Sequence, residues 1–293
     1  PIIILQEKQQ IIQQTQLLEF CLNDKSVADL GGLDNFKDWL KLRSNSFSQA
    51  AINYGLPYPK GLLLVGVQGT GKSVAAKTIA CEWELPLLRL DFGRLFASLV
   101  GQSEQRVRKM IEIAEALSPC VLWVDEIDKA FAGAQSSGDS GTTSRVLATF
   151  ITWLSEKNSA VFVVATANNI DMIPAEILRK GRFDEMFFLG LPTLEEREAI
   201  FNVHLKKYRP DDMGNFQAKL LSELSKEFSG AEIEQVVIEA MRLGFNENRE
   251  FNNEDLLVTI QNIVPLARTK SKELNILKEW SESGNVTSAS KYR

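Results

Sequence analysis

Five short runs of apolar residues punctuate the first two thirds of the chain. Each run is four or five residues long and is apolar almost throughout, so it does not alternate with polar residues as a half-exposed strand would. Strands of this kind are buried on both faces, as in a parallel sheet between layers of helices. Helical patterns separate the first four runs. We therefore predict an α/β fold in three αβα layers, with a five-stranded parallel sheet formed by Leu62–Val65, Leu87–Leu90, Val121–Val124, Val161–Ala165 and Met186–Leu189.

Beyond Pro192 the strand pattern disappears. Four segments have helical patterns, at 194–205, 216–228, 232–243 and 253–263. The tail from Ser281 onward is polar and rich in serine, and we expect it to be disordered. The predicted domains are a large αβα domain over residues 29–191, a small all-α lid over 192–270 and a C-terminal extension over 271–293.

The first 28 residues differ from the rest in composition. From Ile2 to Leu22, apolar residues alternate with glutamines, which predicts an amphipathic helix or two packing on a partner surface. Because the sequence starts at Pro1 and not at a methionine, we expect residues 1–28 to be a helical linker at the end of a longer N-terminal region.

The segment Gly66–Ser73 reads GVQGTGKS, which fits the pattern G-x-x-x-x-G-K-[ST] between a predicted strand and a predicted helix. In such a loop, backbone N–H groups cradle phosphate oxygens at a helix N-terminus. We expect Lys72 to reach the β- and γ-phosphates of ATP and the Ser73 hydroxyl to hold Mg²⁺. The alternative is a plain glycine turn. The predicted nucleotide contacts are Gly66, Val67, Gln68, Gly69, Thr70, Gly71, Lys72, Ser73 and Val74.

The run VLWVDEID, from Val121 to Asp128, delivers two carboxylates to the end of a predicted strand. Ligands of open α/β sheets bind at the carboxyl ends of the strands. We predict that Asp125 organises the magnesium ion and that Glu126 is the general base for water, so that ATP is hydrolysed and not only bound. The alternative is that the two acids cap the helix that follows.

Composition narrows the choice of protein class. The 33 lysines and arginines against 38 acidic residues give a net charge of -5, which argues against a protein that binds nucleic acid through bulk positive charge. Three scattered cysteines are too few for a disulfide framework and favour a reducing compartment. No apolar run approaches the roughly 18 residues of a transmembrane helix.

The two motifs, together with RKGRFD at residues 179–184, resemble the AAA branch of the AAA+ superfamily of ATPases. The resemblance runs from about Asp29 to Arg268 and implies an αβα ATPase domain with a helical lid. The segments DLGGLDNFKDWL and SGAEIEQVVIEA match parts of this branch that lie near the base and ribose of the nucleotide. The contacts that they imply are Leu30, Gly31, Gly230 and Ala231.

Two further polar residues have counterparts in this branch. Asn168, at the end of VVATANN, matches the polar sensor residue that touches the γ-phosphate or orients the lytic water; its alternative role is to cap a strand end. His204, the single histidine, matches a histidine near the adenosine; by itself it would be taken for a residue of the helix surface or of the lid packing.

The resemblance also gives a role to the arginines of RKGRFD. In this branch, arginines at the positions of Arg179 and Arg182 reach into the ATP site of the next subunit and stabilise the charge on the γ-phosphoryl oxygens. Such residues require a ring. The alternative is a surface turn in which an arginine forms a salt bridge with Asp184 or Glu185.

The sequence departs from the pattern of this branch in two places. Val67 and Gln68 stand where two prolines are common, which should loosen the preset backbone of the loop but not remove its N–H donors. Leu99 precedes Val100 and Gly101, where members that thread polypeptide usually carry an aromatic residue, so the support for threading is weak. A second pore segment, 133–145, is small and polar, and we expect it to be mobile.

The resemblance thus implies a Mg²⁺-dependent ATPase that forms a ring, with a hexamer as the arrangement expected for this branch, and that remodels or regulates a protein partner. An ATP-dependent assembly switch and, less favoured by the charge, a DNA-acting AAA+ protein are the alternatives. The sequence as a whole is similar to those of an AAA family of cyanobacteria and algal plastid genomes. This resemblance implies a photosynthetic organism and a cytoplasmic or stromal location.

Overall fold

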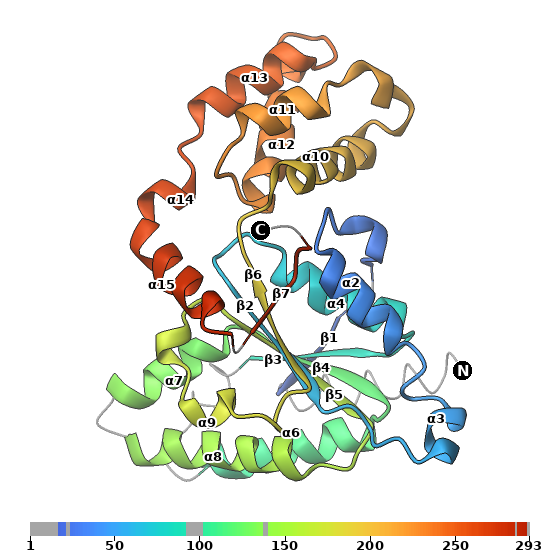
Figure 1. Cartoon of the computed structure of the whole chain (residues 1–293), viewed down its shortest axis with the longest axis vertical. Coiled ribbons are helices and arrows are strands. Elements are labelled where there is room, and N and C mark those ends of the chain that lie inside the picture. The colour runs from blue at the N-terminus through green and yellow to red at the C-terminus, as the bar shows by residue number, and fades with distance from the viewer. Residues whose placement is uncertain (1–16, 22–23, 92–101, 137–139, 285, 292–293) are drawn as a thin grey trace. The chain divides into compact units, whose positions relative to one another are not determined.

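The computed structural model describes residues 17–21, 24–91, 102–136, 140–284 and 286–291. Within these residues the chain divides into two compact units. The first contains residues 39–65 and 76–187 together with the N-terminal segment, and the second contains residues 26–38, 66–75 and 188–293. Figure 1 traces the elements of both units along the chain. No helix in the described part of the chain is long and apolar enough to cross a membrane.

The described strands form one mixed sheet of seven strands in the order β1-β3-β4-β5-β2-β6-β7. The central strands β3, β4, β5 and β2 run parallel, and β1 pairs antiparallel with β3. The α/β class and the five predicted strands are confirmed. The strands are β1 Leu18–Cys21, β2 Gly61–Gly66, β3 Leu87–Leu90, β4 Cys120–Val124, β5 Val161–Ala167, β6 Glu185–Leu189 and β7 Thr287–Ser288.

Burial explains why the central runs are apolar on both faces. Every residue of β2, β4 and β5 is buried, as expected for strands covered on both sides. In the first unit, α6 packs on α8, and α7 packs on α8 and β5. The rings of Trp39 and Trp83 pack against Phe162 at centroid distances of 6.2 and 4.8 Å. The helices up to β6 are α2 Asp34–Leu42, α3 Gln49–Tyr54, α4 Lys72–Glu82, α6 Gln102–Ala116, α7 Ile127–Ser136, α8 Ser140–Glu156 and α9 Ala175–Leu178, with 3-10 turns η1 Val27–Asp29 and η2 Ile170–Met172.

The second unit contains the predicted helical lid. Phe201, Leu205, Leu221, Val236 and Leu256 form its buried core. Three of its helices begin with a capping box, in which a polar side chain and an acidic residue three positions later satisfy the free N–H groups of the first turn. The helices after β6 are α10 Leu194–Tyr208, α11 Ala218–Leu224, α12 Gly230–Asn246, α13 Asn253–Asn262, α14 Leu266–Thr269 and α15 Ser271–Glu282, with the 3-10 turn η3 Pro210–Asn215.

The N-terminal segment corrects one prediction. Residues 1–16 lie outside the described residues, but Leu18–Cys21 forms a strand and not the helix expected up to Leu22. The reason is the partner: Leu18 and Cys21 lie opposite Leu90 and Leu87 of β3, so the segment completes the sheet at its edge. A strand of only four residues gives too little periodicity to be distinguished from an amphipathic helix.

The prediction for the C-terminal tail is also wrong in part. Instead of being disordered, Thr287–Ser288 forms the edge strand β7, and Ala289 is fully buried. The N–H of Ala289 donates to the carbonyl of Phe188 at 2.9 Å, and its own carbonyl accepts from the N–H of Phe36 at 3.2 Å. The side chain of Asn35 donates to the carbonyls of Ser288 and Ser290, each at 3.0 Å. Backbone hydrogen bonds hold this tail, so its polar side chains do not report its order.

Candidate functional site: a phosphate loop, an acidic pair and an arginine turn

The phosphate loop follows β2 and opens α4. Gly69 and Gly71 have positive φ angles of 85° and 94°, a region that residues with a side chain rarely adopt. A Cβ atom on Gly66 would lie 2.2 Å from the carbonyl oxygen of Leu189, so only glycine fits there. The sequence pattern therefore reflects backbone geometry at three positions, as expected for a cradle of N–H groups.

Lys72 closes this loop from inside. Its Nζ donates to the carbonyls of Gly66 at 2.7 Å and of Val67 at 2.6 Å, and the Thr70 hydroxyl donates to Val67 at 2.9 Å. The Lys72 residue is only 8% exposed. These bonds hold the loop at Val67, one of the two positions where prolines are common in the branch that the sequence resembles, so side chains fix the backbone here. The Ser73 residue is exposed.

The second unit also brings the other predicted nucleotide-contacting segments to this loop. The N–H of Ala231 donates to the carbonyl of Gly69 at 3.1 Å, and Gly230 lies next to the same carbonyl. Gly31 abuts Ile200 of α10 so closely that a Cβ would lie 2.5 Å from its side chain, and Leu30 is buried. The lead-in segment and the start of α12 are thus fixed within the same unit as the loop.

His204 lies on α10 and faces α12. Its Nδ1 is 3.6 Å from a carboxylate oxygen of Glu234, which also accepts from Lys207 at 3.0 Å. The His204 side chain is 17% exposed. The structure therefore gives this histidine a partner within the lid, and its predicted contact with the adenosine stays a prediction.

The acidic pair lies in the first unit, at the carboxyl end of β4. One oxygen of Asp125 accepts from the Thr166 hydroxyl at 2.8 Å, and the other accepts from the Arg89 guanidinium at 2.9 Å. The Thr166 oxygen also accepts from the N–H of Glu126 at 3.0 Å. Glu126 has a positive φ of 51°, which turns its side chain out of the strand direction. Thr166 therefore orients both acids.

Asn168, at the end of the neighbouring strand β5, belongs to the same cluster. Its side-chain amide donates to Glu126 at 3.2 Å, and Lys129 forms an ion pair with Glu126. Asp128 holds the backbone just after β5, because its carboxylate accepts from the N–H groups of Asn168 and Asn169 at 3.2 and 3.0 Å. Burial raises the pKa of the Asp128 carboxyl. The structure thus brings Asp125 and Glu126, predicted from one motif, together with Asn168, predicted from another.

The arginine turn is also built in the first unit. Asp184 accepts from the backbone N–H groups of Lys60 at 2.7 Å and Gly61 at 2.9 Å. The Lys60 side chain donates to the carbonyl of Gly181 at 2.9 Å. Arg182 donates to the carbonyl of Glu176, and Arg179 is exposed. The turn is pinned to the start of β2, with Arg179 exposed and Arg182 partly buried.

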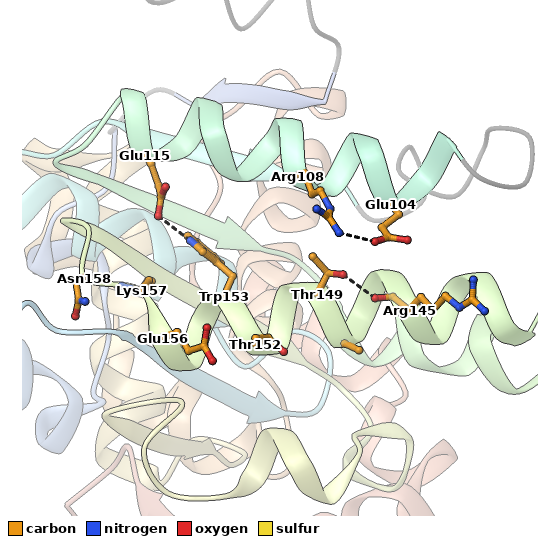
Figure 2. Close-up of a pocket in the computed structure, with 11 residues that line it drawn as sticks. Glu104, Arg108, Glu115, Arg145, Thr149, Thr152, Trp153, Glu156, Lys157 and Asn158 are labelled. Atoms are coloured by element: carbon orange, nitrogen blue, oxygen red, sulfur yellow. Dashed lines mark hydrogen bonds and ion pairs between the residues drawn. The ribbon is translucent and has the colours of Figure 1, made fainter.

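A separate groove of about 770 Å³ lies between α6 and α8 (Figure 2). Its lining carries charged and polar side chains, but none of the predicted site residues. Glu115, at one end, accepts from the Trp153 indole at 2.9 Å and from the Ser159 hydroxyl at 3.0 Å. The Glu115 carboxylate therefore helps to hold α6 and α8 together.

The predicted pore residues Leu99, Val100 and Gly101 lie outside the described residues. Most of the second pore segment, 133–145, was expected to be a mobile loop, but it belongs to α7 up to Ser136 and to α8 from Ser140. Small polar residues did not prevent helix formation there because the segment continues two helices with buried faces, at Phe131 and Val146.

The donor set fits the phosphates of a nucleotide and a magnesium ion. A Cβ atom on Gly71 would meet nothing within 4 Å, so the loop is open there, and the Ser73 residue is exposed. Asp125 offers carboxylate oxygens, the ligand type that Mg²⁺ prefers directly or through water. In the described residues, no group of three or more His, Cys, Asp or Glu side chains forms a metal cage of its own. Each unit therefore carries groups of its own that suit one part of a magnesium–nucleotide complex: the loop suits the phosphates and Asp125 suits the metal ion.

Comparison with known proteins agrees with this geometry. The sequence model that represents the ATPase family associated with various cellular activities (AAA) matches residues 62–191 of the chain. A proteasome-activating nucleotidase of Saccharolobus islandicus (strain M.14.25 / Kamchatka #1) is 30% identical over 288 residues, which cover 96% of this chain and 71% of that protein. The chain belongs to the AAA family.

Other relatives of this AAA chain are more similar. The uncharacterized AAA domain-containing protein ycf46 of Guillardia theta is 59% identical over 288 residues, 98% of this chain and 57% of that protein. The protein of the same name in Pyropia yezoensis is 58% identical over 288 residues, again 98% of this chain and 58% of that protein. The chain thus spans less than three fifths of the length of these relatives. The resemblance to the AAA branch is confirmed.

Sequence reasoning missed residues that support the AAA site. Thr166 and Arg89 contact Asp125, and Lys60 holds the arginine turn. Thr166 and Arg89 did carry a signal, because each is a polar residue inside an otherwise apolar strand. Lys60 carried none, since a lysine before a strand is ordinary.

Proposed function

We propose that this chain hydrolyses ATP in a Mg²⁺-dependent reaction. The observation that carries the proposal is the hydrogen-bonded cluster of Asp125, Glu126 and Asn168, held by Thr166. A loop that only binds nucleotide has no need of a carboxylate and an amide that face each other after two neighbouring strands. Family membership and the glycine cradle around Lys72 support the same reaction.

The proposed roles follow from the chemistry of each group. Backbone N–H groups of the phosphate loop and the Lys72 ammonium bind the β- and γ-phosphates. Bound Mg²⁺ would neutralise phosphate charge, with Ser73 and Asp125 as the residues that hold it. Glu126 takes the proton of the attacking water, and Asn168 orients that water or touches the γ-phosphate. The bond to Asn168 positions the carboxylate of Glu126 for this task.

The arginines would act between subunits. Asp184 and Lys60 pin the turn, while Arg179 is exposed and Arg182 caps the carbonyl of Glu176. A guanidinium that leaves this surface to meet a neighbouring γ-phosphate would stabilise the transition state by several powers of ten in rate. We therefore propose a ring of identical subunits, with six as the expected number for this branch.

The ring would use hydrolysis to remodel or regulate a protein partner. One relative is by its name a proteasome-activating nucleotidase, and that name supports the proposal of a protein partner. The relatives of Guillardia theta and Pyropia yezoensis support a photosynthetic organism, and we propose the cytoplasm of a cyanobacterium or the plastid stroma as the location. Leu99, in place of an aromatic residue, favours the second candidate, an ATP-dependent assembly switch that threads no substrate.

The decisive variant is Glu126→Gln, which keeps the hydrogen-bonding shape and removes the base. We expect it to bind ATP with an affinity near that of the native chain and to release phosphate at least 100-fold more slowly. Equal phosphate release by the two proteins would refute the assignment of the base.

A mixing experiment tests the ring. Arg182→Ala and Lys72→Ala subunits are each expected to be inactive alone, and mixtures should regain part of the activity at interfaces that combine an intact loop with an intact arginine. No recovery at any ratio would contradict an arginine that acts between subunits.

A further inference from the structure

Arg89 is a cation inside an apolar strand, and it is aimed at the acidic pair. In the register of the sheet, Arg89 of β3 lies opposite Trp123 of β4, so its side chain shares a face with Trp123 and with Asp125 two residues on. Its guanidinium carbon lies 5.0 Å from the centroid of the Trp123 ring, and its NH2 group donates to Asp125 at 2.9 Å.

Two donors divide the Asp125 carboxylate between them. The Thr166 hydroxyl takes one oxygen, and the Arg89 guanidinium takes the other. Thr166 is neutral and fixes the orientation of the carboxylate, while Arg89 also cancels its charge. The Asp125 side chain is 21% exposed and that of Arg89 is 41% exposed, so water screens this pair only in part.

Glu19 adds a weaker contact from the edge strand β1. It lies directly opposite Arg89 in the antiparallel register, and its carboxylate is 3.8 Å from the other terminal nitrogen. Both side chains are about 40% exposed, which limits the energy of this pair. Glu19 thus contacts one terminal nitrogen of the guanidinium, and the other terminal nitrogen donates to Asp125.

We propose that Arg89 is a positioning residue that makes the acidic pair selective for a metal ion that arrives with its nucleotide. A cation beside Asp125 repels a bare divalent ion, because the two are like charges. The same cation attracts the complex of Mg²⁺ with ATP, which is an anion. This inference rests on the proposed function, since it names which form of the metal and nucleotide the site takes.

The proposed effects of Arg89 on the bare divalent ion and on the complex with ATP have opposite signs. A purely structural role of Arg89 would not produce opposite signs. If Arg89 only held β1, β3 and β4 together, its loss would weaken every ligand. If it tunes the charge at Asp125, its loss strengthens binding of the bare ion and weakens binding of the complex, while Thr166 still orients the carboxylate.

The experiment uses the full chain with Glu126→Gln, so that ATP is not consumed. Binding of Mn²⁺ without nucleotide is measured by electron paramagnetic resonance, and binding of MgATP by calorimetry. In Arg89→Met we expect about tenfold tighter binding of Mn²⁺ and about threefold to tenfold weaker binding of MgATP, as a charge removed at such range implies.

Two variants serve as controls. Arg89→Lys keeps the charge but loses the planar group over Trp123, so it should change both affinities less than Arg89→Met does. Arg108→Met removes an arginine on α6, which pairs with Glu104 at 2.8 Å, and should change neither affinity. Changes of the same sign for both ligands in Arg89→Met, or no change in Mn²⁺ binding, would overturn the proposal. If no variant binds nucleotide, the proposed function fails, and the Mn²⁺ comparison still decides the role of Arg89.

Discussion

Lys157 gives the first unit a pH dependence that can be calculated. It follows α8, is 7% exposed, and its ammonium donates to the carbonyls of Val161 and, at 3.4 Å, of Pro59. The pKa of Lys157 is lowered to about 8, mainly by burial; the Asp184 carboxylate opposes this shift and the nearby Lys60 ammonium adds to it. In the unfolded chain the pKa of a lysine is about 10.4.

The sign follows from proton binding. Between the two pKa values the unfolded chain holds the proton and the folded chain has lost it, so the free energy of unfolding rises with pH. A difference of about 2.4 units corresponds to about 3 kcal/mol, of which about 2.5 kcal/mol falls between pH 7 and pH 10. Lys157→Met has no such proton, so the native chain should gain that amount relative to the variant over this range.

The assay is denaturant unfolding at half-unit steps of pH, followed by tryptophan fluorescence. Lys109→Met, which removes an exposed lysine of α6, is the control and should run parallel to the native chain. The reasoning is refuted if the difference between the native chain and Lys157→Met stays constant from pH 7 to pH 10.

Three further predictions concern the site, the lid and the tail. Thr166→Val removes the hydroxyl that joins both acids, so we expect kcat for ATP to fall at least tenfold with a smaller change in KM, measured by phosphate release. Asp255→Asn breaks the paired 2.7 Å bonds from Arg249 in the lid and should cost about 2 kcal/mol of unfolding free energy at pH 7. Arg249 lowers the pKa of Asp255, so this contribution is lost as the pH falls below about 4. The unfolding free energies of the two proteins should converge there. Ala289→Asp places a charge at a fully buried position, and thermal unfolding should show a loss of about 3 kcal/mol, whereas Ser283→Asp at the exposed C-terminal end of α15 should cost less than about 1 kcal/mol.

The elements that sequence predicts best are those whose own side chains decide them. The runs at β2, β4 and β5 are apolar because both faces are buried, so burial is visible in the sequence. The capping boxes at Thr193, Ser229 and Asn252 likewise mark where α10, α12 and α13 begin. Local chemistry specifies these features before any distant contact forms.

The edge strands could not be predicted in the same way. The LEFC segment of β1 becomes a strand because β3 offers a free edge, and β7 is held by carbonyl and N–H groups of Phe36 and Phe188. Neither partner is near in sequence, and backbone hydrogen bonds leave no mark on side-chain composition.

The candidate site divides along the same line. Glycines 69 and 71 and the acids 125 and 126 stand in fixed motifs because backbone angles and charge require those residue types. Asp184 was considered as a salt-bridge partner for an arginine of the turn, and in the structure its carboxylate binds backbone N–H groups. A carboxylate that binds the backbone has no partner that a sequence motif could reveal.

The central claim is that this chain turns over ATP with the phosphate loop and the acidic pair. The most direct measurement is steady-state release of phosphate from ATP, with and without Mg²⁺, by the native chain beside Lys72→Ala. We predict Mg²⁺-dependent release by the native chain and only background release by the variant, which lacks the ammonium that binds Gly66 and Val67. Release by the native chain no faster than by Lys72→Ala would contradict the account.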